Sequence, residues 1–134
     1  MSTDIRYVNK NNQKKEGSFF VSGLISCANG STPDYILFTL PRASLVTRAY
    51  AIVTDAAGAG DTLDIKVGTT VLANEIAISA LGVASGTVTP TYFPTGGTVS
   101  LVAGDGGVLG DACAFKIVVE YIETELSEGA YTDW

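Results

Sequence analysis

Short apolar segments separated by turn-forming residues recur along most of this chain, and no other feature limits its fold as strongly. The clearest segment is Thr62–Val67, in which Leu63, Ile65 and Val67 alternate strictly with polar residues. Side chains of a β-strand point to alternate faces, so this pattern predicts a strand with one buried face. Further segments are rich in β-branched and aromatic residues: Ser18–Cys27, Tyr35–Leu40, Ser44–Thr54, Val71–Leu72, Thr98–Val102 and Ala114–Ile122. Strands recurring in this way between Gly, Pro and Asp turns predict an all-β fold, a single β-sandwich or jelly-roll domain.

Two of the predicted strands carry apolar residues on both faces. In Ala114–Ile122 the main core face is predicted to hold Phe115, Ile117, Val119 and Tyr121. Ser44–Thr54 is long enough for a helix, but strand alternation divides it into one face (Val46, Arg48, Tyr50 and Ile52) and another (Leu45, Thr47, Ala49, Ala51 and Val53). Strands with two apolar faces are at least half covered on both sides.

The middle of the chain permits more than one interpretation. Ala73–Leu81 fits a short helix capped by Asn74, an extended edge with Ile76 and Ile78 on one face, or a plain connector. Gly82–Gly97 is rich in Gly, Thr and Pro, and we expect an irregular loop there.

The length of 134 residues fits a single domain and leaves little room for a second core. Polarity divides the chain into an N-terminal arm (residues 1–17), a sandwich domain (residues 18–124) and an acidic C-terminal tail (residues 125–134). Only 16% of the residues are charged, while 46% are hydrophobic. The surface therefore carries few ions, which is typical of a protein that works in an assembly.

The net charge of −6 argues against a nucleic-acid-binding protein, because phosphate binding needs clustered Lys and Arg. The charges are nevertheless unevenly distributed. Basic residues gather in the arm (Arg6, Lys10, Lys14 and Lys15) and acidic residues near the C-terminus (Glu120, Glu123, Glu125, Glu128 and Asp133). Both ends are either solvated termini, or docking arms in which the basic segment binds an acidic patch on a neighbouring subunit or partner.

The chain contains no histidine, which removes His-dependent catalytic triads and most transition-metal sites. An enzyme would depend on carboxylates, and Asp61 with Asp64 is the candidate pair for glycoside hydrolysis. Their spacing places them on opposite faces of a strand, which favours a role in a turn. Asp105 and Asp111 offer oxygen ligands to calcium, but no calcium-binding repeat surrounds them. We therefore expect no catalytic site, no metal and no cofactor.

Cys27 and Cys113 lack the spacing of a metal or redox motif and are predicted to be buried free thiols. Residues 1–17 lack the apolar core of a secretory signal, and no apolar run is long enough to span a membrane. These features predict a protein that is made and kept in a cytoplasm and has no membrane partner.

Three aromatic residues are candidates for exposed binding contacts. Tyr92 and Phe93 lie between Pro90 and Pro94, and Trp134 is the last residue. Aromatic side chains in loops stack on sugars or anchor protein interfaces. The alternative for Tyr92 and Phe93 is packing over the end of the sandwich, whereas Trp134 is expected to dock on a neighbour.

The chain resembles the small auxiliary head proteins of tailed bacteriophages. The resemblance lies in the segments Gly60–Gly68 (GDTLDIKVG), Thr91–Gly97 (TYFPTGG) and Val118–Thr124 (VVEYIET). It implies a decoration or cement protein that is assembled in the host cytoplasm, binds the outside of the capsid shell and stabilises it. Its implied partners are the major capsid protein and further copies of itself in a homotrimer. Two alternatives stay open: a phage fibre or spike module that binds a host glycan, and a carboxylate glycosidase.

The N-terminal arm is the candidate docking segment of such a protein. Asp4–Val8 is apolar and β-prone enough, through Ile5 and Tyr7, to add to a sheet edge, whereas Asn9–Lys15 is too polar for a core. We expect the arm to order on a neighbouring subunit or on the capsid surface. The candidate partner-binding residues are Ile5, Arg6, Tyr7, Lys10, Lys14, Lys15, Tyr92, Phe93 and Trp134.

Overall fold

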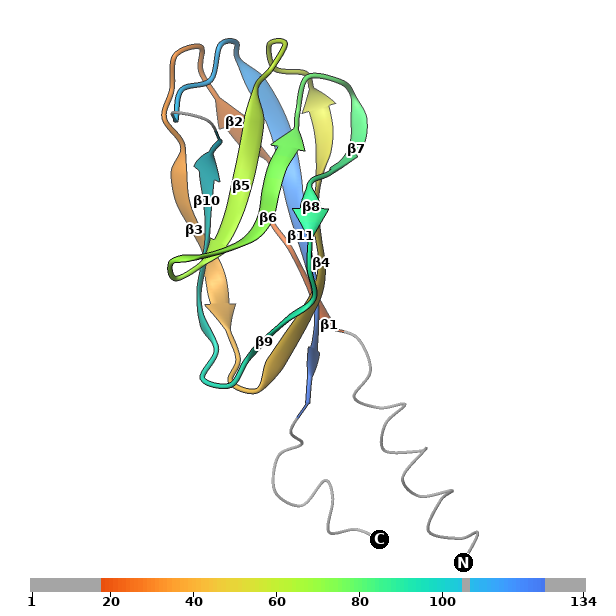
Figure 1. Cartoon of the computed structure of the whole chain (residues 1–134). Helices are drawn as coiled ribbons and strands as arrows, with labels where there is room; N and C mark the ends of the chain where they lie inside the picture. The colour runs from red at the N-terminus through yellow and green to blue at the C-terminus, as the bar shows by residue number, and fades with distance from the viewer. Residues whose placement is uncertain (1–17, 105–106, 125–134) are drawn as a thin grey trace, which may run out of the picture.

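The computed structural model describes residues 18–104 and 107–124. Every regular element in this part of the chain is a β-strand, and the strands form two antiparallel sheets packed face to face (Figure 1). The strands are β1 (Ser18–Val21), β2 (Ile25–Cys27), β3 (Asp34–Leu40), β4 (Ser44–Asp55), β5 (Thr62–Val67), β6 (Thr70–Ala77), β7 (Gly82–Ser85), β8 (Thr87–Val88), β9 (Thr91–Phe93), β10 (Gly97–Ala103) and β11 (Cys113–Glu123). The all-β prediction is confirmed.

The order of the strands is that of a jelly roll. Sheet I runs β1–β11–β4–β7, with β2 also beside β11 and β9 also beside β4, and sheet II runs β3–β10–β5–β6–β8. The antiparallel pairs are nested along the chain: β5 with β6, β4 with β7 and β9, β3 with β10, and β1 and β2 with β11. Folding such a nested ribbon onto itself gives the two-sheet roll.

The core lies between the sheets and is filled by alternate residues of their strands. Leu63, Ile65 and Val67 are buried on β5, as their alternation predicted. Phe115, Ile117 and Val119 are fully buried on β11. Tyr121, at the end of this face, is half-buried and packs against the core. The predicted core face of the last strand is therefore confirmed.

Stacked aromatic rings close one side of the sandwich. The rings of Phe20 on β1 and Phe38 on β3 are stacked, with their centroids 4.4 Å apart. Tyr121 on β11 is also stacked with Phe38, at a centroid distance of 5.9 Å. Contacts of this kind add about 0.5–1.5 kcal/mol to the gain from apolar burial. They fix the edge of sheet I over the edge of sheet II.

The predicted faces of β4 are correct after residue 48 and wrong before it. Ala49, Ala51 and Val53 are buried on one face, as predicted. Before residue 48, however, Val46 is buried, whereas Leu45 and Thr47 of the same predicted face are not fully buried. The cause is a β-bulge, because Arg48 is opposite Glu120 and Val46 is opposite Tyr121, so that one residue of β4 is extra. The bulge turns Leu45 outward. A period of two in the sequence does not reveal such an insertion.

Two other segments also differ from the prediction. Ser18–Cys27 is not one strand, because the chain leaves β11 at Ser22–Leu24. Ser22 bridges the break: its N–H donates to the Ile117 carbonyl (2.9 Å), and its Oγ accepts from the Ile117 N–H (2.8 Å). Gly82–Gly97 is not an irregular loop, since it holds three short strands that pair alternately with β4, β6 and β4 again.

The segment Ala73–Leu81, for which the sequence left three interpretations open, is not helical. Strand β6 extends to Ala77, and both Ile76 and Ile78 are fully buried. The extended interpretation with these two residues on the core side is therefore the correct one. Glu75, directly before Ile76, has a positive φ of 57°, and its N–H donates to the carboxylate of Asp64 (2.8 Å). This contact holds the irregular turn of β6 against β5.

Cys27 and Cys113 are buried free thiols, as predicted, and they are directly opposite each other in the β2–β11 pair. Burial first, and the neighbouring Cys27 second, raise the pKa of the Cys113 thiol to about 11. Only the thiolate reacts rapidly with alkylating agents.

We expect alkylation of Cys113 in the folded protein to accelerate only as the pH approaches about 11. In denaturant it should follow the ordinary thiol pKa of about 8.5. Because folding favours the protonated thiol, its contribution to stability is complete below about pH 8.5 and declines as the pH rises through the folded pKa. Pulse alkylation followed by peptide mass spectrometry measures the Cys113 rate. Equal pH profiles in the folded and unfolded protein would contradict the burial of this thiol.

Candidate interaction surfaces

The outer face of sheet I is unusually apolar for a surface. Residues that alternate with the buried ones on β1, β11, β4, β7 and β9 point away from the core. We call this surface the sheet I face; its apolar members are Phe19, Val21, Leu45, Tyr50, Ile52, Val83, Tyr92, Val118 and Ile122. Phe19 and Val83, near its two opposite edges, are each 68% exposed.

The strand registers arrange these side chains in rows across the sheet. One row runs Tyr92, Leu45, Ile122, and another runs Val21, Val118, Tyr50. Between them lies Phe19 with Glu120 and Arg48, and beyond them lies Lys116 with Ile52 and Val83. Val118 faces outward and is nevertheless only 5% exposed, because Val21 and Tyr50 flank it. The rows therefore form one continuous surface.

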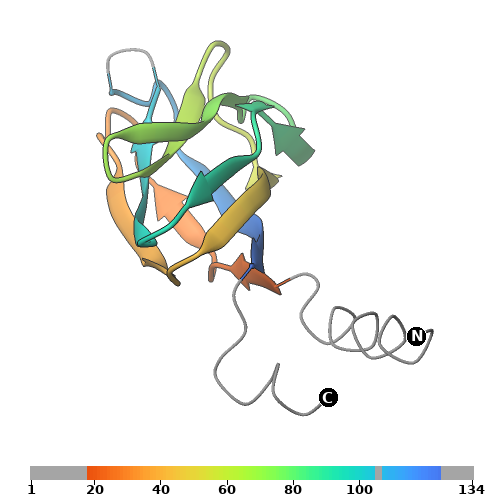
Figure 2. The same cartoon turned by 60° about the horizontal axis from the view of Figure 1, so that its bottom comes forward.

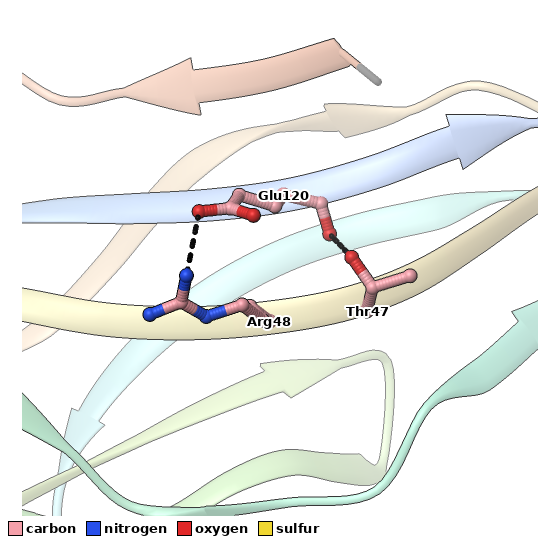
Figure 3. A network of polar contacts seen from close by, with 3 residues as sticks. All are labelled: Thr47, Arg48 and Glu120. Atoms are coloured by element: carbon pink, nitrogen blue, oxygen red, sulfur yellow. Dashed lines mark hydrogen bonds and ion pairs between the residues drawn. The ribbon is translucent and has the colours of Figure 1, made fainter. Parts of the chain in front are cut away.

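A small polar cluster lies in the middle of the sheet I face, at the bulge of β4 (Figure 3). Arg48 Nη1 is 3.5 Å from Glu120 Oε2, and the hydroxyl of Thr47 donates to the Glu120 carbonyl oxygen (3.2 Å). The Arg48 guanidinium lies 4.8 Å from the centroid of the Tyr50 ring. Burial first, then the hydrogen bond with Glu120, raises the pKa of Tyr50. The Arg48 side chain is 59% exposed, so the pair itself adds at most about 1 kcal/mol to folding.

The outer face of sheet II has a different character. Its outward residues are mostly hydroxyl-bearing or charged: Thr39, Thr62, Asp64, Lys66, Thr98 and Ser100. Ile36, Val71, Ala77 and Val102 are apolar residues on the same face. The outer face of sheet II is therefore the more polar of the two, although Ile36 on it is 75% exposed.

A groove of about 270 Å³ lies between the edge strands β1 and β2 of sheet I and β3 of sheet II. Its lining is uncharged and consists of Phe20, Val21, Ser22, Gly23, Ile25, Tyr35, Ile36 and Leu37. Along β3 the only charged residue is Asp34, at the first position. An edge strand without charges is open to pairing with another strand.

The carboxylates considered for catalysis serve the backbone. Asp61 accepts hydrogen bonds from the N–H groups of Gly58 (2.9 Å) and Gly110 (2.9 Å), which ties the β4–β5 loop to the β10–β11 loop. Asp64 accepts from Glu75, as described above. Within residues 18–104 and 107–124 there is no group of three or more Cys, Asp or Glu side chains that could hold a metal ion. Asp105, one of the residues considered for calcium, lies outside the described residues.

The predicted partner-binding residues fall into two groups. Tyr92 lies on the sheet I face and is 48% exposed, whereas the neighbouring Phe93 packs against the core. The remaining candidates (Ile5, Arg6, Tyr7, Lys10, Lys14, Lys15 and Trp134) lie outside the described residues. Sequence reasoning missed Phe19, Val21 and Val83. The apolar second faces of Ser44–Thr54 and Ala114–Ile122 indicated the centre of this surface, but they gave no signal for these three residues at its edges.

No protein-family model and no curated protein matches the chain. Solved structures do match it. One is a chain of the cyanophage Pam1 capsid asymmetric unit, with a TM-score of 0.60 at 14% identity over 80% of this chain and 84% of that chain. Another comes from the acidic stable capsid structure of the Helicobacter pylori bacteriophage KHP30, with a TM-score of 0.55 at 15% identity over 79% and 86%. This chain has the fold of two chains from phage capsid structures.

Similarity at these identities concerns the fold and no individual residue. Because each match covers similar shares of both chains, the matched chains are about as long as this one.

In the described part of the chain, no helix has the length and hydropathy needed to cross a bilayer.

Proposed function

We propose that this chain is a virion structural protein that binds the outside of a phage capsid shell and stabilises it. The observation that carries the proposal is the fold shared with chains of two phage capsid structures over about four-fifths of the sequence. The apolar sheet I face gives such a protein a surface for assembly.

A fibre or spike module that binds a host glycan is the second candidate. The observation in its favour is the half-exposed ring of Tyr92, because aromatic rings stack on sugars. The two functions differ in stoichiometry, since a decoration protein is present in many copies per particle and a fibre module in few.

The test is to count copies in purified particles of the phage that encodes the chain and to delete its gene. We expect tens to hundreds of copies on the head by quantitative gel and image reconstruction. Particles that lack the protein should release their DNA at a lower temperature than wild-type particles. Adding the purified protein should restore the wild-type release temperature. Absence of the chain from heads, or its presence only on tail fibres, would overturn the proposal.

The N-terminal arm is expected to contribute to the docking. Deletion of residues 2–15 should leave the sandwich folded, because the described strands begin at Ser18. It should weaken binding to particles that lack the protein, since Asp4–Val8 would no longer add to a sheet edge and four basic residues would be lost. Sedimentation of the protein with these particles measures the affinity.

A matched variant separates the two contributions of the arm. Neutralising Lys10, Lys14 and Lys15 to Gln keeps Asp4–Val8 and should mainly reduce the salt dependence of binding. If the deleted protein bound particles as tightly as the intact one, the arm would be a tether only.

A further inference from the structure

We infer that the sheet I face is the surface through which copies of this chain associate with one another, so that its occupant is a second copy. The inference rests on the proposed function only for its biological setting, because self-association is measured on the free protein. It assigns the subunit contact to residues of β1, β4, β7, β9 and β11, and it leaves the sheet II face exposed.

The size of the sheet I face fits a subunit interface. On this sheet β4 and β11 have 12 and 11 residues, whereas β1, β7 and β9 have 4, 4 and 3. At ~3.3 Å per residue and ~4.8 Å between strands, they cover about 540 Å². Two such faces together would bury about 1,100 Å², just above the ~1,000 Å² that a specific interface is expected to exceed.

The composition of the face also fits an interface. Aromatic and branched apolar residues occupy most of the four rows, and the ionic groups of the face are Arg48, Glu120 and Lys116 within these rows and Asp55 beyond them. Interface cores are likewise enriched in aromatic residues and Arg and depleted of other charges. Phe19 and Val83, at the rim of the face, are each 68% exposed, so a partner on the face would remove much of their apolar surface from water.

Charge identifies a second copy as the occupant. The protein carries a net charge of −6, yet the ionic groups of this face cancel: Arg48 and Lys116 are cationic, and Glu120 and Asp55, which is opposite Ala114, are anionic. Two acidic copies therefore repel each other least when this face takes part in the contact. Arg48 is 59% exposed beside Glu120, so most of its donors are free to bind a carboxylate of the other copy. A second copy always supplies such a carboxylate.

The position of the arm agrees with this occupant. The described chain begins at Ser18, next to Phe19 on the edge of the sheet I face. The 17 residues before Ser18 can reach about 55 Å when extended. A copy seated on the face therefore lies within reach of the arm.

The experiment uses two matched double variants of the full chain. Phe19→Lys with Val83→Lys places two cations on the sheet I face, and Ile36→Lys with Val71→Lys places two on the sheet II face at similarly exposed positions. Sedimentation velocity over a concentration series gives the association constant. We expect the intact protein to associate, the first variant to lose at least 10-fold in affinity, and the second to match the intact protein. Far-UV circular dichroism and the unfolding midpoint verify that both variants are folded.

Two results would overturn the inference. One is an intact protein that stays monomeric at high micromolar concentration, and the other is a Phe19→Lys, Val83→Lys variant that associates like the intact protein. A third result would separate the inference from the proposed function. If the free protein is monomeric, and the Phe19→Lys, Val83→Lys variant fails to bind capsid particles while the intact protein and the other variant bind them, the sheet I face docks on the shell. The proposed function would then hold and the inference would be wrong. If the proteins associate as we expect, but neither the intact protein nor the variants bind particles, the inference holds and the proposed function is wrong.

Discussion

Ile117→Ala is expected to lower the free energy of unfolding by roughly 2–5 kcal/mol. Ile117 is fully buried in the middle of β11, which lies between β1 and β4 in sheet I. Removing most of its side chain leaves a cavity in a core whose strands are held on both sides and cannot collapse into the space. Chemical denaturation gives the change in free energy from the shift of the midpoint.

Ile36→Ala is the matched control, because it removes the same atoms from a side chain that is 75% exposed. We expect it to change the free energy of unfolding by no more than about 0.5 kcal/mol. If the two substitutions had equal effects, β11 would not be the central strand of the core.

Gly96→Ala is the second substitution with a large expected effect, about 2–5 kcal/mol in total. Gly96 has a φ of 70° in the turn between β9 and β10, and its N–H donates to the Phe93 carbonyl (3.2 Å). For any L-residue other than glycine, this left-handed conformation lowers the stability of the fold by about 1–2 kcal/mol. A Cβ here would also overlap the backbone carbonyl of Leu40 and the backbone of Pro41. Forcing these turns apart costs about another 1–3 kcal/mol.

Gly30→Ala isolates the conformational part of that cost. Gly30 has a similar φ of 77°, but an added Cβ would meet no atom within 4 Å. We expect only the roughly 1–2 kcal/mol of the left-handed conformation at this position. Thermal or chemical unfolding of both variants measures the difference. Similar values for the two would mean that the β9–β10 turn is free to move away from Leu40.

The strands that could be predicted from the sequence are those whose burial is regular. Leu63, Ile65 and Val67 alternate without interruption, so the orientation of β5 follows directly from the period. The same holds for Phe115, Ile117 and Val119 on β11. The short strands β7, β8 and β9 could not be predicted, because they are only two to four residues long and owe their structure to pairing with β4 and β6.

The candidate site was less predictable, for a related reason. Tyr92 and Phe93 are adjacent, and only the register of β9 on β4 decides that the first faces outward and the second inward. Phe19, Phe20 and Val21 are three consecutive apolar residues, so no alternation shows which of them is exposed. The bulge of β4 brings Arg48 opposite Glu120, and these residues are 72 positions apart in the sequence. Local patterns contain no information on such contacts.

The position of β11 has a consequence for synthesis of the protein. Among the described residues, β11 is the last strand, and it is an inner strand of sheet I, with β1 and β2 on one side and β4 on the other (Figure 2). While the ribosome is still translating, β1 has no partner, and non-local pairing of this kind folds slowly. Val118, Glu120 and Ile122 of the sheet I face also belong to β11. The surface that we propose for subunit contacts can therefore form only after all the other described strands have been synthesised.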